Sequence, residues 1–110
     1  LIVITDETYC ELTYGVSHIP FATLPGMWDR TITINGLSKS YAMTGWRIGY
    51  IGAPSAMIAQ MPKVHQYNVT CAAAMAQYAA INALETGDED IEFMRETSLC
   101  NVHGRPRSSC

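Results

Sequence analysis

The sequence lacks a strong excess of charge of either sign. It has 7 lysine and arginine residues against 10 aspartate and glutamate residues, which gives a formal net charge of −3. Proteins that bind nucleic acid through its phosphates need a basic surface. The charge balance therefore argues against nucleic acid as a main partner.

Long apolar runs are also missing, although 48% of the residues are hydrophobic. A membrane-spanning helix needs about 18 or more consecutive apolar residues, and no stretch reaches that length. The first five residues are apolar but have no basic flank, so they do not match a signal peptide. We expect a globular, cytoplasmic protein with no membrane partner.

Metal-binding patterns are absent as well. Their residue types are present but scattered: Cys10, Cys71, Cys100 and Cys110, with His18, His65 and His103. The cysteine spacings match no zinc motif, and Cys100 with His103 supplies too few ligands for a site. We expect no metal.

Two short runs rich in β-branched residues, at 1–5 and 31–34, predict strands, and 46–52 is a third candidate strand. The first reads as a strand buried on both faces. Helices are expected over 54–66, 71–85 and 88–97. Pro62 should break or bend the first of these, because a proline inside a helix costs about 3 kcal/mol. From 99 to 110 there is no helical period, so we expect an irregular tail of unknown status.

Lys39 directly follows the second predicted strand, and Arg47 comes eight residues later. A lysine amine can condense with an aldehyde to form a Schiff base. An arginine can hold a phosphate with two parallel hydrogen bonds. The two side chains could therefore hold both ends of an aldehyde that carries a phosphate, and pyridoxal phosphate is such a molecule.

The predicted topology brings a third residue, Asp6, towards this pair. Asp6 lies just past the end of the first strand, and Lys39 lies just past the end of the second. If these strands are parallel, both residues lie at the sheet edge where open α/β sheets bind ligands. The link from Lys39 to Arg47 is too short for a parallel crossover. The third strand should therefore be antiparallel, with Arg47 near its start at the same edge.

The segment 35–50 resembles the lysine motif of class I and II aminotransferases, which are pyridoxal-phosphate enzymes of fold type I. The matching residues are Gly36, Ser38, Lys39, Arg47 and Gly49. Upstream, the segment 4–9 is similar to the family's Asp-Glu-x-Tyr motif. The resemblance runs over residues 1–95, and the stretch around Arg47 most resembles the aspartate-aminotransferase-like branch.

This resemblance implies a role for each motif residue. Lys39 would form the Schiff base with pyridoxal phosphate and, once released by substrate, would carry the proton. Arg47 would bind the cofactor phosphate with help from the Ser38 hydroxyl. Asp6 would face the pyridine nitrogen, and Tyr9 would face the ring hydroxyl.

The same residues also have ordinary explanations. Lys39 could be a solvated surface lysine, and Arg47 could belong to a surface ion pair. Asp6 could cap the turn that follows it, and Tyr9 could be a half-buried aromatic residue. For Ser38, a small residue in a tight turn explains the sequence as well as a phosphate ligand does. Glu7 is expected to be structural or to face solvent.

The resemblance implies an α/β fold in which 1–98 form part of a cofactor-binding large domain. Its sheet would be mostly parallel, with one antiparallel strand after the lysine turn and helices behind it. The full-length protein would be a homodimer that transfers an amino group from an L-amino acid to a 2-oxo acid. The family's glycine-rich phosphate loop, ring-stacking aromatic residue and substrate-binding arginine have no counterpart in the chain. We therefore expect a fragment that is inactive alone.

Two alternatives stay open. The chain could come from another fold type I enzyme, a lyase or synthase, because the residues that steer the reaction after cofactor binding lie mostly outside the matched motifs. It could also be a non-catalytic remnant that folds alone or packs onto a partner. The identity of the amino acid and of the oxo acid cannot be read from these residues.

Overall fold

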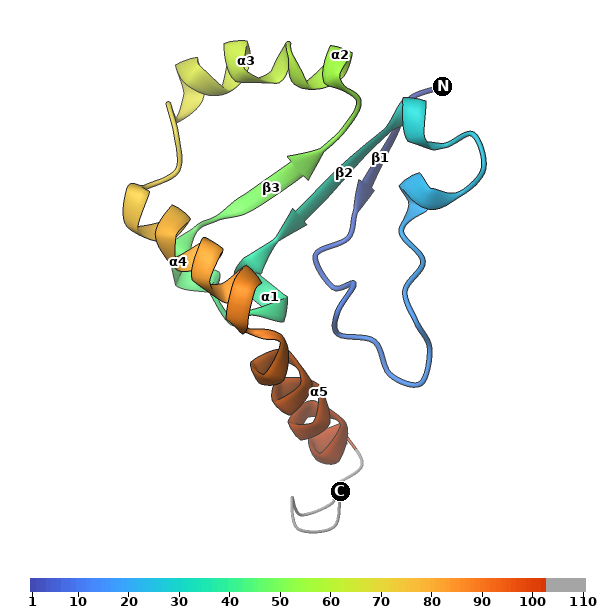
Figure 1. Ribbon diagram of the computed structural model, residues 1–110, viewed down its shortest axis with the longest axis vertical. Coiled ribbons are helices and arrows are strands. Elements are labelled where there is room, and N and C mark those ends of the chain that lie inside the picture. The colour runs from blue at the N-terminus through green and yellow to red at the C-terminus, as the bar shows by residue number, and fades with distance from the viewer. Residues whose placement is uncertain (103–110) are drawn as a thin grey trace.

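A three-stranded sheet organises the computed structural model, which describes residues 1–102 (Figure 1). Its strands are β1 (Val3–Asp6), β2 (Thr31–Gly36) and β3 (Gly49–Gly52), with β2 in the middle. β1 pairs with β2 in parallel, and β3 pairs with β2 in the antiparallel direction. The predicted α/β class and the predicted strand directions are confirmed.

The register of the sheet fixes the start of the lysine turn. Gly36, the last residue of β2, lies opposite Gly49, the first residue of β3. A Cβ atom on Gly49 would come within 2.9 Å of the Asn35 carbonyl oxygen. Glycine at this position therefore lets the two backbones approach closely where the chain leaves the sheet.

A long connection joins β1 to β2 and carries two short 3₁₀ turns, η1 (Phe21–Thr23) and η2 (Trp28–Arg30). η1 packs against β2. At the end of the connection, the hydroxyl of buried Thr31 donates a hydrogen bond to the Met27 carbonyl at 2.7 Å. The end of the connection is thus attached to the sheet, while residues 14–20 are exposed.

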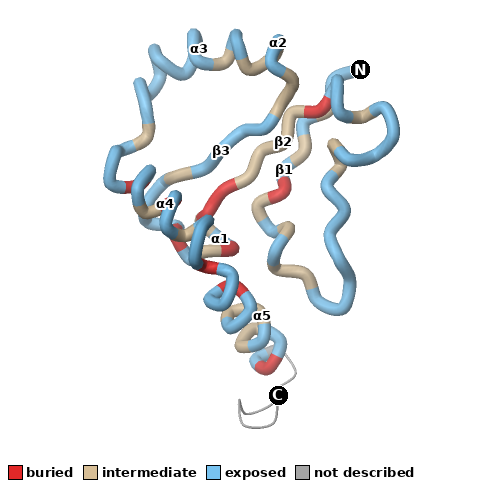
Figure 2. The backbone as a smooth tube through the Cα atoms, in the orientation of Figure 1, coloured by how far each residue is buried: buried red, intermediate tan, exposed pale blue. Residues whose placement is uncertain are grey.

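The lysine turn consists of α1 (Leu37–Ser40) and η3 (Thr44–Trp46), and helix α4 (Ala74–Thr86) covers it. The core here is formed by Leu37, Met43 and Ala80, with Tyr41, Ile48, Ala79 and Ala83 packed against it. The alanines of α4 bring its backbone close to the turn, because small side chains permit close packing. Figure 2 shows this region as one of the main buried segments.

The helices differ from the predictions at their ends. The helix expected over 54–66, with a break or bend at Pro62, is broken into two helices, α2 (Ser55–Ile58) and α3 (Met61–Asn68). The break precedes Pro62, which lies in the first turn of α3, where its missing N–H is not needed. α4 begins three residues later than expected, because Thr70 is left-handed at φ +64° and Ala73 is extended.

Two further boundaries are corrected. The third strand begins at Gly49 rather than at residue 46, because 44–46 form a 3₁₀ turn and Arg47 is left-handed. Helix α5 (Asp88–Val102) extends beyond residue 97. The expected irregular tail is therefore wrong for 99–102, where burial of Cys100 supports the helix. The rest of that tail lies outside the described residues.

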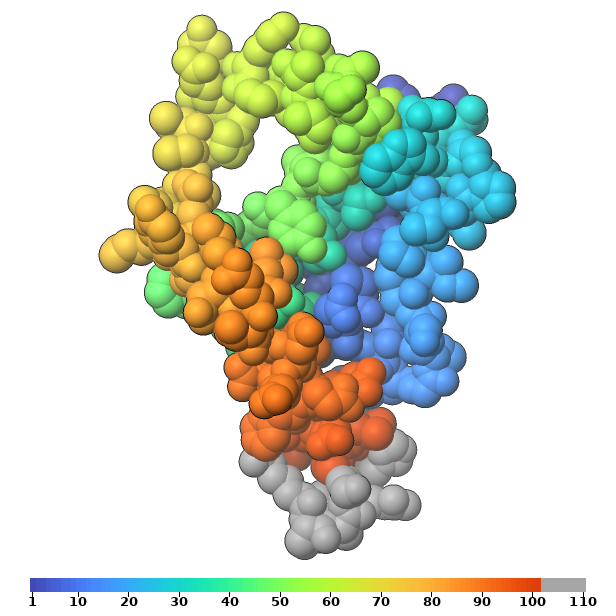
Figure 3. All heavy atoms as spheres, in the orientation of Figure 1, coloured from blue at the N-terminus to red at the C-terminus, as the bar shows by residue number. Residues whose placement is uncertain are grey.

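The sheet is more exposed than the sequence predicts. Ile4 on β1 is 66% exposed, so β1 is not buried on both faces, and every residue of β3 is exposed. The part of the chain that the structure describes supplies no layer over these surfaces. The space-filling view shows an opening bounded by α3, β3 and α4 (Figure 3). Within residues 1–102, no helix is long and apolar enough to cross a membrane.

Substituting Gly49→Ala tests the close approach of β2 and β3. The new methyl group would meet the Asn35 carbonyl, and such overpacking typically costs about 1–3 kcal/mol. Gly52→Ala, on the same strand, is the matched control because nothing lies within 4 Å of its Cβ position. We expect urea unfolding, followed by circular dichroism, to show destabilisation for Gly49→Ala alone. Equal losses in the two variants would contradict the assigned contact.

Candidate active site

Lys39 lies on a short turn that is closed by hydrogen bonds on both sides of it. The Met43 amide donates to the Leu37 carbonyl at 3.1 Å. The Thr44 hydroxyl donates to the Ser38 carbonyl at 2.8 Å. Lys39 itself is exposed, while its neighbour Ser40 is buried. The turn therefore fixes the backbone of Lys39 and leaves its amine at the surface.

Tyr9 lies beside Lys39, although 30 residues separate them in the sequence. The Lys39 Nζ atom is 5.7 Å from the centre of the Tyr9 ring, within the range of a cation–π contact. The Tyr9 side chain is 59% exposed. The structure thus brings together an amine and a phenol that the sequence predicts for one site.

Asp6 ends β1 and lies opposite Ile34 of β2, which precedes the lysine turn. Its Oδ1 atom accepts hydrogen bonds from the Thr8 hydroxyl at 2.8 Å and from the Thr8 amide at 3.2 Å. These bonds, the hydroxyl first, hold the pKa of Asp6 below its usual value of 3.8. Asp6 therefore caps its turn, as the ordinary explanation has it, and presents an ionised carboxylate at the carboxyl edge of the sheet.

Arg47 lies between η3 and β3 in the left-handed conformation, with φ +52°. Its Nη1 atom donates to the Thr44 carbonyl at 2.9 Å, and the residue is exposed. Ala42, earlier in the same turn, is also left-handed at φ +53°. Non-glycine residues in this region are uncommon and cluster at functional sites. Arg47 comes two residues before the start of β3, so it lies at the predicted edge of the sheet.

Ser38 is half-buried on α1, and its carbonyl accepts the Thr44 hydroxyl bond. The contacts of Ser38 therefore agree with a structural role in the turn, and a role for its hydroxyl in phosphate binding stays a prediction. Beyond the Lys39–Tyr9 contact, the five predicted residues share a sheet edge through strand register. The roles assigned to them from the sequence also stay predictions.

Several cavities lie on the described part of the chain. One of about 260 Å³ is lined by Lys39 and by residues from α5 and the loop: Leu12, Phe93, Met94, Thr97 and Ser98. A larger one of about 530 Å³ lies between residues 13–17 and α5. None of the five predicted residues lines the larger cavity, so the smaller cavity is the one relevant to the lysine.

Glu7 is a buried structural residue, which is one of the two alternatives that the sequence left open. It is buried, with 6% of its surface exposed, and its carboxylate contacts His18 and Phe21. A signal for this burial was available, because side chains alternate along a strand. Val3 and Thr5 form the more buried face of β1, and Glu7 continues it.

Asn35 provides a second connection that the sequence did not indicate. Its Nδ2 atom donates to the Cys10 Sγ atom at 3.3 Å, and its Oδ1 atom accepts the Gly36 amide at 2.7 Å. Burial raises the pKa of the Cys10 thiol. Cys10 follows Tyr9 directly, so Asn35 links the segment that carries Tyr9 to the start of the lysine turn.

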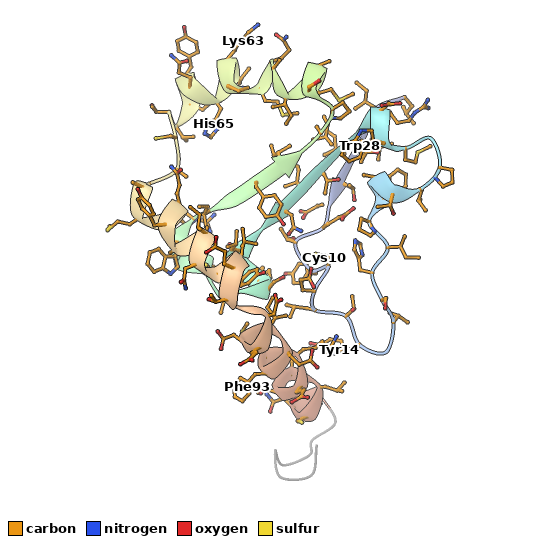
Figure 4. The ribbon with its side chains drawn as sticks, in the orientation of Figure 1. Cys10, Tyr14, Trp28, Lys63, His65 and Phe93 are labelled. Carbon is orange, nitrogen blue, oxygen red and sulfur yellow. The ribbon has the colours of Figure 1, made fainter. Side chains whose placement is uncertain are left out.

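Lys63, the other lysine of the chain, lies on α3, well away from Cys10 (Figure 4).

Comparison with known protein families gives a match to aminotransferase class I and II over residues 1–99. A putative aminotransferase of Bacillus subtilis, YugH, is 50% identical over 97 residues, which cover 88% of this chain and 25% of the relative. A probable N-acetyl-LL-diaminopimelate aminotransferase of the same organism is 51% identical over 86% of this chain and 23% of its own length. An aspartate aminotransferase of Pyrococcus abyssi is 50% identical over 87% of this chain and 25% of its own length.

Solved structures agree with this match. The aromatic aminotransferase from Pyrococcus horikoshii superposes with a TM-score of 0.82 at 48% identity, over 87% of this chain and 26% of that structure. The N-succinyldiaminopimelate aminotransferase from Mycobacterium tuberculosis superposes with a TM-score of 0.84 at 38% identity, over 88% of this chain and 26% of that structure. The chain spans about a quarter of the length of the relatives it matches. It belongs to the class I and II aminotransferase family.

Proposed function

We propose that this chain carries the cofactor-binding lysine turn of a pyridoxal-phosphate-dependent aminotransferase. The observation that carries the proposal is the placement of the Lys39 amine 5.7 Å from the Tyr9 ring, beside the carboxyl edge of a parallel strand pair. Because the chain spans about a quarter of its relatives, we assign the activity to a longer polypeptide that contains it. Residues 1–98 would form part of its large domain.

The residues at this edge match the chemical groups of pyridoxal phosphate. An amine, an ionised carboxylate, a phenol and a guanidinium suit an aldehyde, a pyridine nitrogen, a ring hydroxyl and a phosphate, respectively. When bound, the cofactor supplies an electrophilic carbonyl carbon and an electron-withdrawing ring. The donor set therefore fits the cofactor that the family uses.

Lys39 would act first as the attachment point and then as the base. Its exposed amine can reach a ligand at the edge, while the closed turn keeps its backbone in place. When it is not bonded to the cofactor, the Lys39 Nζ atom would act as a general base that accepts a proton from the substrate α-carbon and as the acid that gives a proton back. The proposed overall reaction transfers an amino group from an L-amino acid to a 2-oxo acid.

The other three groups would orient the ligand. Asp6 stays ionised because Thr8 bonds its carboxylate, so it can hold a proton on the pyridine nitrogen by charge. The Tyr9 hydroxyl can donate to the ring oxygen next to the reacting carbon. Arg47 can grip phosphate with its planar fork, and Ser38 can add a hydroxyl donor.

Substrate choice would depend on other parts of the protein. Relatives that are 50–51% identical to this segment are named for different amino-group donors, aspartate and an acetylated diaminopimelate. The shared segment therefore fits common machinery rather than a specificity element. From the family resemblance we also propose that the longer polypeptide is a cytoplasmic homodimer.

Selective modification of Lys39 tests the proposal. The chain has two lysines, Lys39 and Lys63, and the second lies on α3. We expect borohydride reduction after mixing with pyridoxal phosphate to leave a pyridoxyl label mainly on Lys39, mapped by mass spectrometry. Lys39→Ala should remove that label, and the matched control Lys63→Ala should retain it. Equal labelling of both lysines at low cofactor concentration would refute the assignment.

Arg47→Ala tests the phosphate role separately. Loss of a charge-assisted contact worth about 1.5–3 kcal/mol should weaken pyridoxal phosphate binding roughly 10- to 150-fold. Pyridoxal, which lacks the phosphate, should bind both proteins equally. Absorbance titration with the two ligands measures the difference. A similar loss for pyridoxal would mean that Arg47 supports the turn, through its bond to Thr44, instead of binding phosphate.

The 110-residue chain alone should not transaminate. β1 and β3 are edge strands of the described sheet, and the family's substrate-binding arginine has no counterpart in the chain. Without it an amino acid is not oriented, and orientation accounts for about 7–11 kcal/mol of many barriers. An assay of the purified chain with a panel of amino acids and 2-oxoglutarate checks this. Turnover above that of free pyridoxal phosphate, and dependent on Lys39, would show that these residues suffice.

A further inference from the structure

Glu7 is buried between two exposed residues of the candidate site. Its side chain is 5% exposed, whereas Asp6 is exposed and Tyr9 is 59% exposed. Buried carboxylates are rare unless they are paired and hydrogen-bonded, because burying an isolated charge is costly. The burial of the Glu7 carboxylate therefore indicates that specific partners hold it in place.

The Glu7 carboxylate is bonded through both oxygens. Oε1 accepts the Phe21 amide at 3.0 Å and the Thr5 hydroxyl at 3.3 Å. Oε2 lies 3.1 Å from the His18 Nε2 atom. Phe21 and His18 are 14 and 11 residues further along the chain. One side chain thus ties the end of β1 to the middle of the long connection.

These bonds also keep the carboxylate ionised. Burial alone would raise the pKa of Glu7, but the bonds from the Phe21 amide and from His18 outweigh it, so the net pKa lies below 4.5. A group with a lowered pKa stabilises the fold fully above its unfolded value, and this contribution is lost as the pH falls through the folded value. The Glu7 link should therefore be intact at neutral pH.

The Glu7 backbone is held as firmly as its side chain. Its amide donates to the Ile34 carbonyl at 2.8 Å, which extends the parallel ladder, and its carbonyl accepts the Cys10 amide at 2.9 Å. Asp6 and Tyr9 flank this fixed point in the sequence. Their own side chains have few anchors, since Asp6 bonds Thr8 within the same turn. Glu7 is thus the buried and hydrogen-bonded residue of the short segment that carries both.

We propose that Glu7 is a positioning residue, whose buried carboxylate holds the Asp6–Tyr9 turn in the geometry that receives the cofactor ring. The ligand in this inference rests on the proposed function, but the mechanical role of Glu7 does not. Glu7 touches no reacting atom in this scheme. It acts through the Phe21 and His18 bonds, which stop the turn from moving away from Lys39.

Two substitutions at Glu7 test whether its side-chain acceptor oxygen holds the turn: one removes the acceptor and the other keeps it. Glu7→Ala removes the acceptor for the partly buried Phe21 amide and should free the turn. Glu7→Gln keeps an acceptor oxygen of the same reach, so it should rescue most of the effect. Glu11→Gln is the matched control, because Glu11 is an exposed carboxylate four residues away.

Amide hydrogen exchange, read by mass spectrometry on the 110-residue chain without ligand, measures the mechanical role. For Glu7→Ala we expect faster exchange at residues 7–10 and at Phe21, with unchanged protection in α4. Glu7→Gln and Glu11→Gln should resemble the parent chain. Faster exchange throughout α4 would show that Glu7 merely supports the whole fold, and unchanged exchange at 7–10 would show that it fixes nothing; either result overturns the proposal.

A double-mutant cycle on pyridoxal phosphate affinity connects this role to the site. Glu7→Ala should weaken binding roughly 3- to 10-fold in the parent chain and much less in a Tyr9→Phe background, because residues that act as a unit are not additive. If the effects of Glu7→Ala and Tyr9→Phe on binding were fully additive, the proposed coupling between Glu7 and Tyr9 would be wrong. If the parent chain shows no Lys39 label at all, the proposed function fails, and the exchange pattern still decides the role of Glu7.

Discussion

The parallel pairing of β1 with β2 is the constraint on which the candidate site depends. It places Asp6 opposite Ile34, so two chain segments leave the sheet at the same edge. The Tyr9 ring and the Lys39 amine meet at this edge because each follows its strand by only three residues. A slip of one residue would turn Glu7 outward and Asp6 inward, because side chains alternate along a strand. The buried Glu7 network therefore stabilises the register that the site requires.

The lysine turn is specified by a second set of contacts. The Gly36–Gly49 approach starts it, the bond from Thr44 to Ser38 closes it, and the alanine face of α4 covers it. Two left-handed residues, Ala42 and Arg47, are held inside this frame. Such conformations cost free energy and persist where surrounding contacts determine them. Two of the three left-handed non-glycine residues in the described part of the chain thus lie in the segment that carries the lysine and the arginine.

The antiparallel direction of β3 was predicted correctly because it follows from a short connection, which is local information. The parallel pairing of β1 with β2 was an assumption of that argument and an implication of the family resemblance. The sequence also placed Lys39 and Asp6 at strand ends from residue patterns alone. It misplaced the starts of β3 and α4, because left-handed residues such as Thr70 and Arg47 are set by packing rather than by propensity. The Glu7–His18 bond could not be predicted from the sequence, because the two residues are 11 apart and the loop between them has no periodic pattern.

The exposed sheet surfaces explain how the segment can be common to relatives with different names. The residues that match cofactor chemistry lie at one edge and are held by contacts inside the segment: β1 with β2, α4 with the turn, and Glu7 with the loop. One face of β1 and the whole of β3 are exposed in the described part of the chain. Identity near 50% across differently named aminotransferases is what this separation would allow.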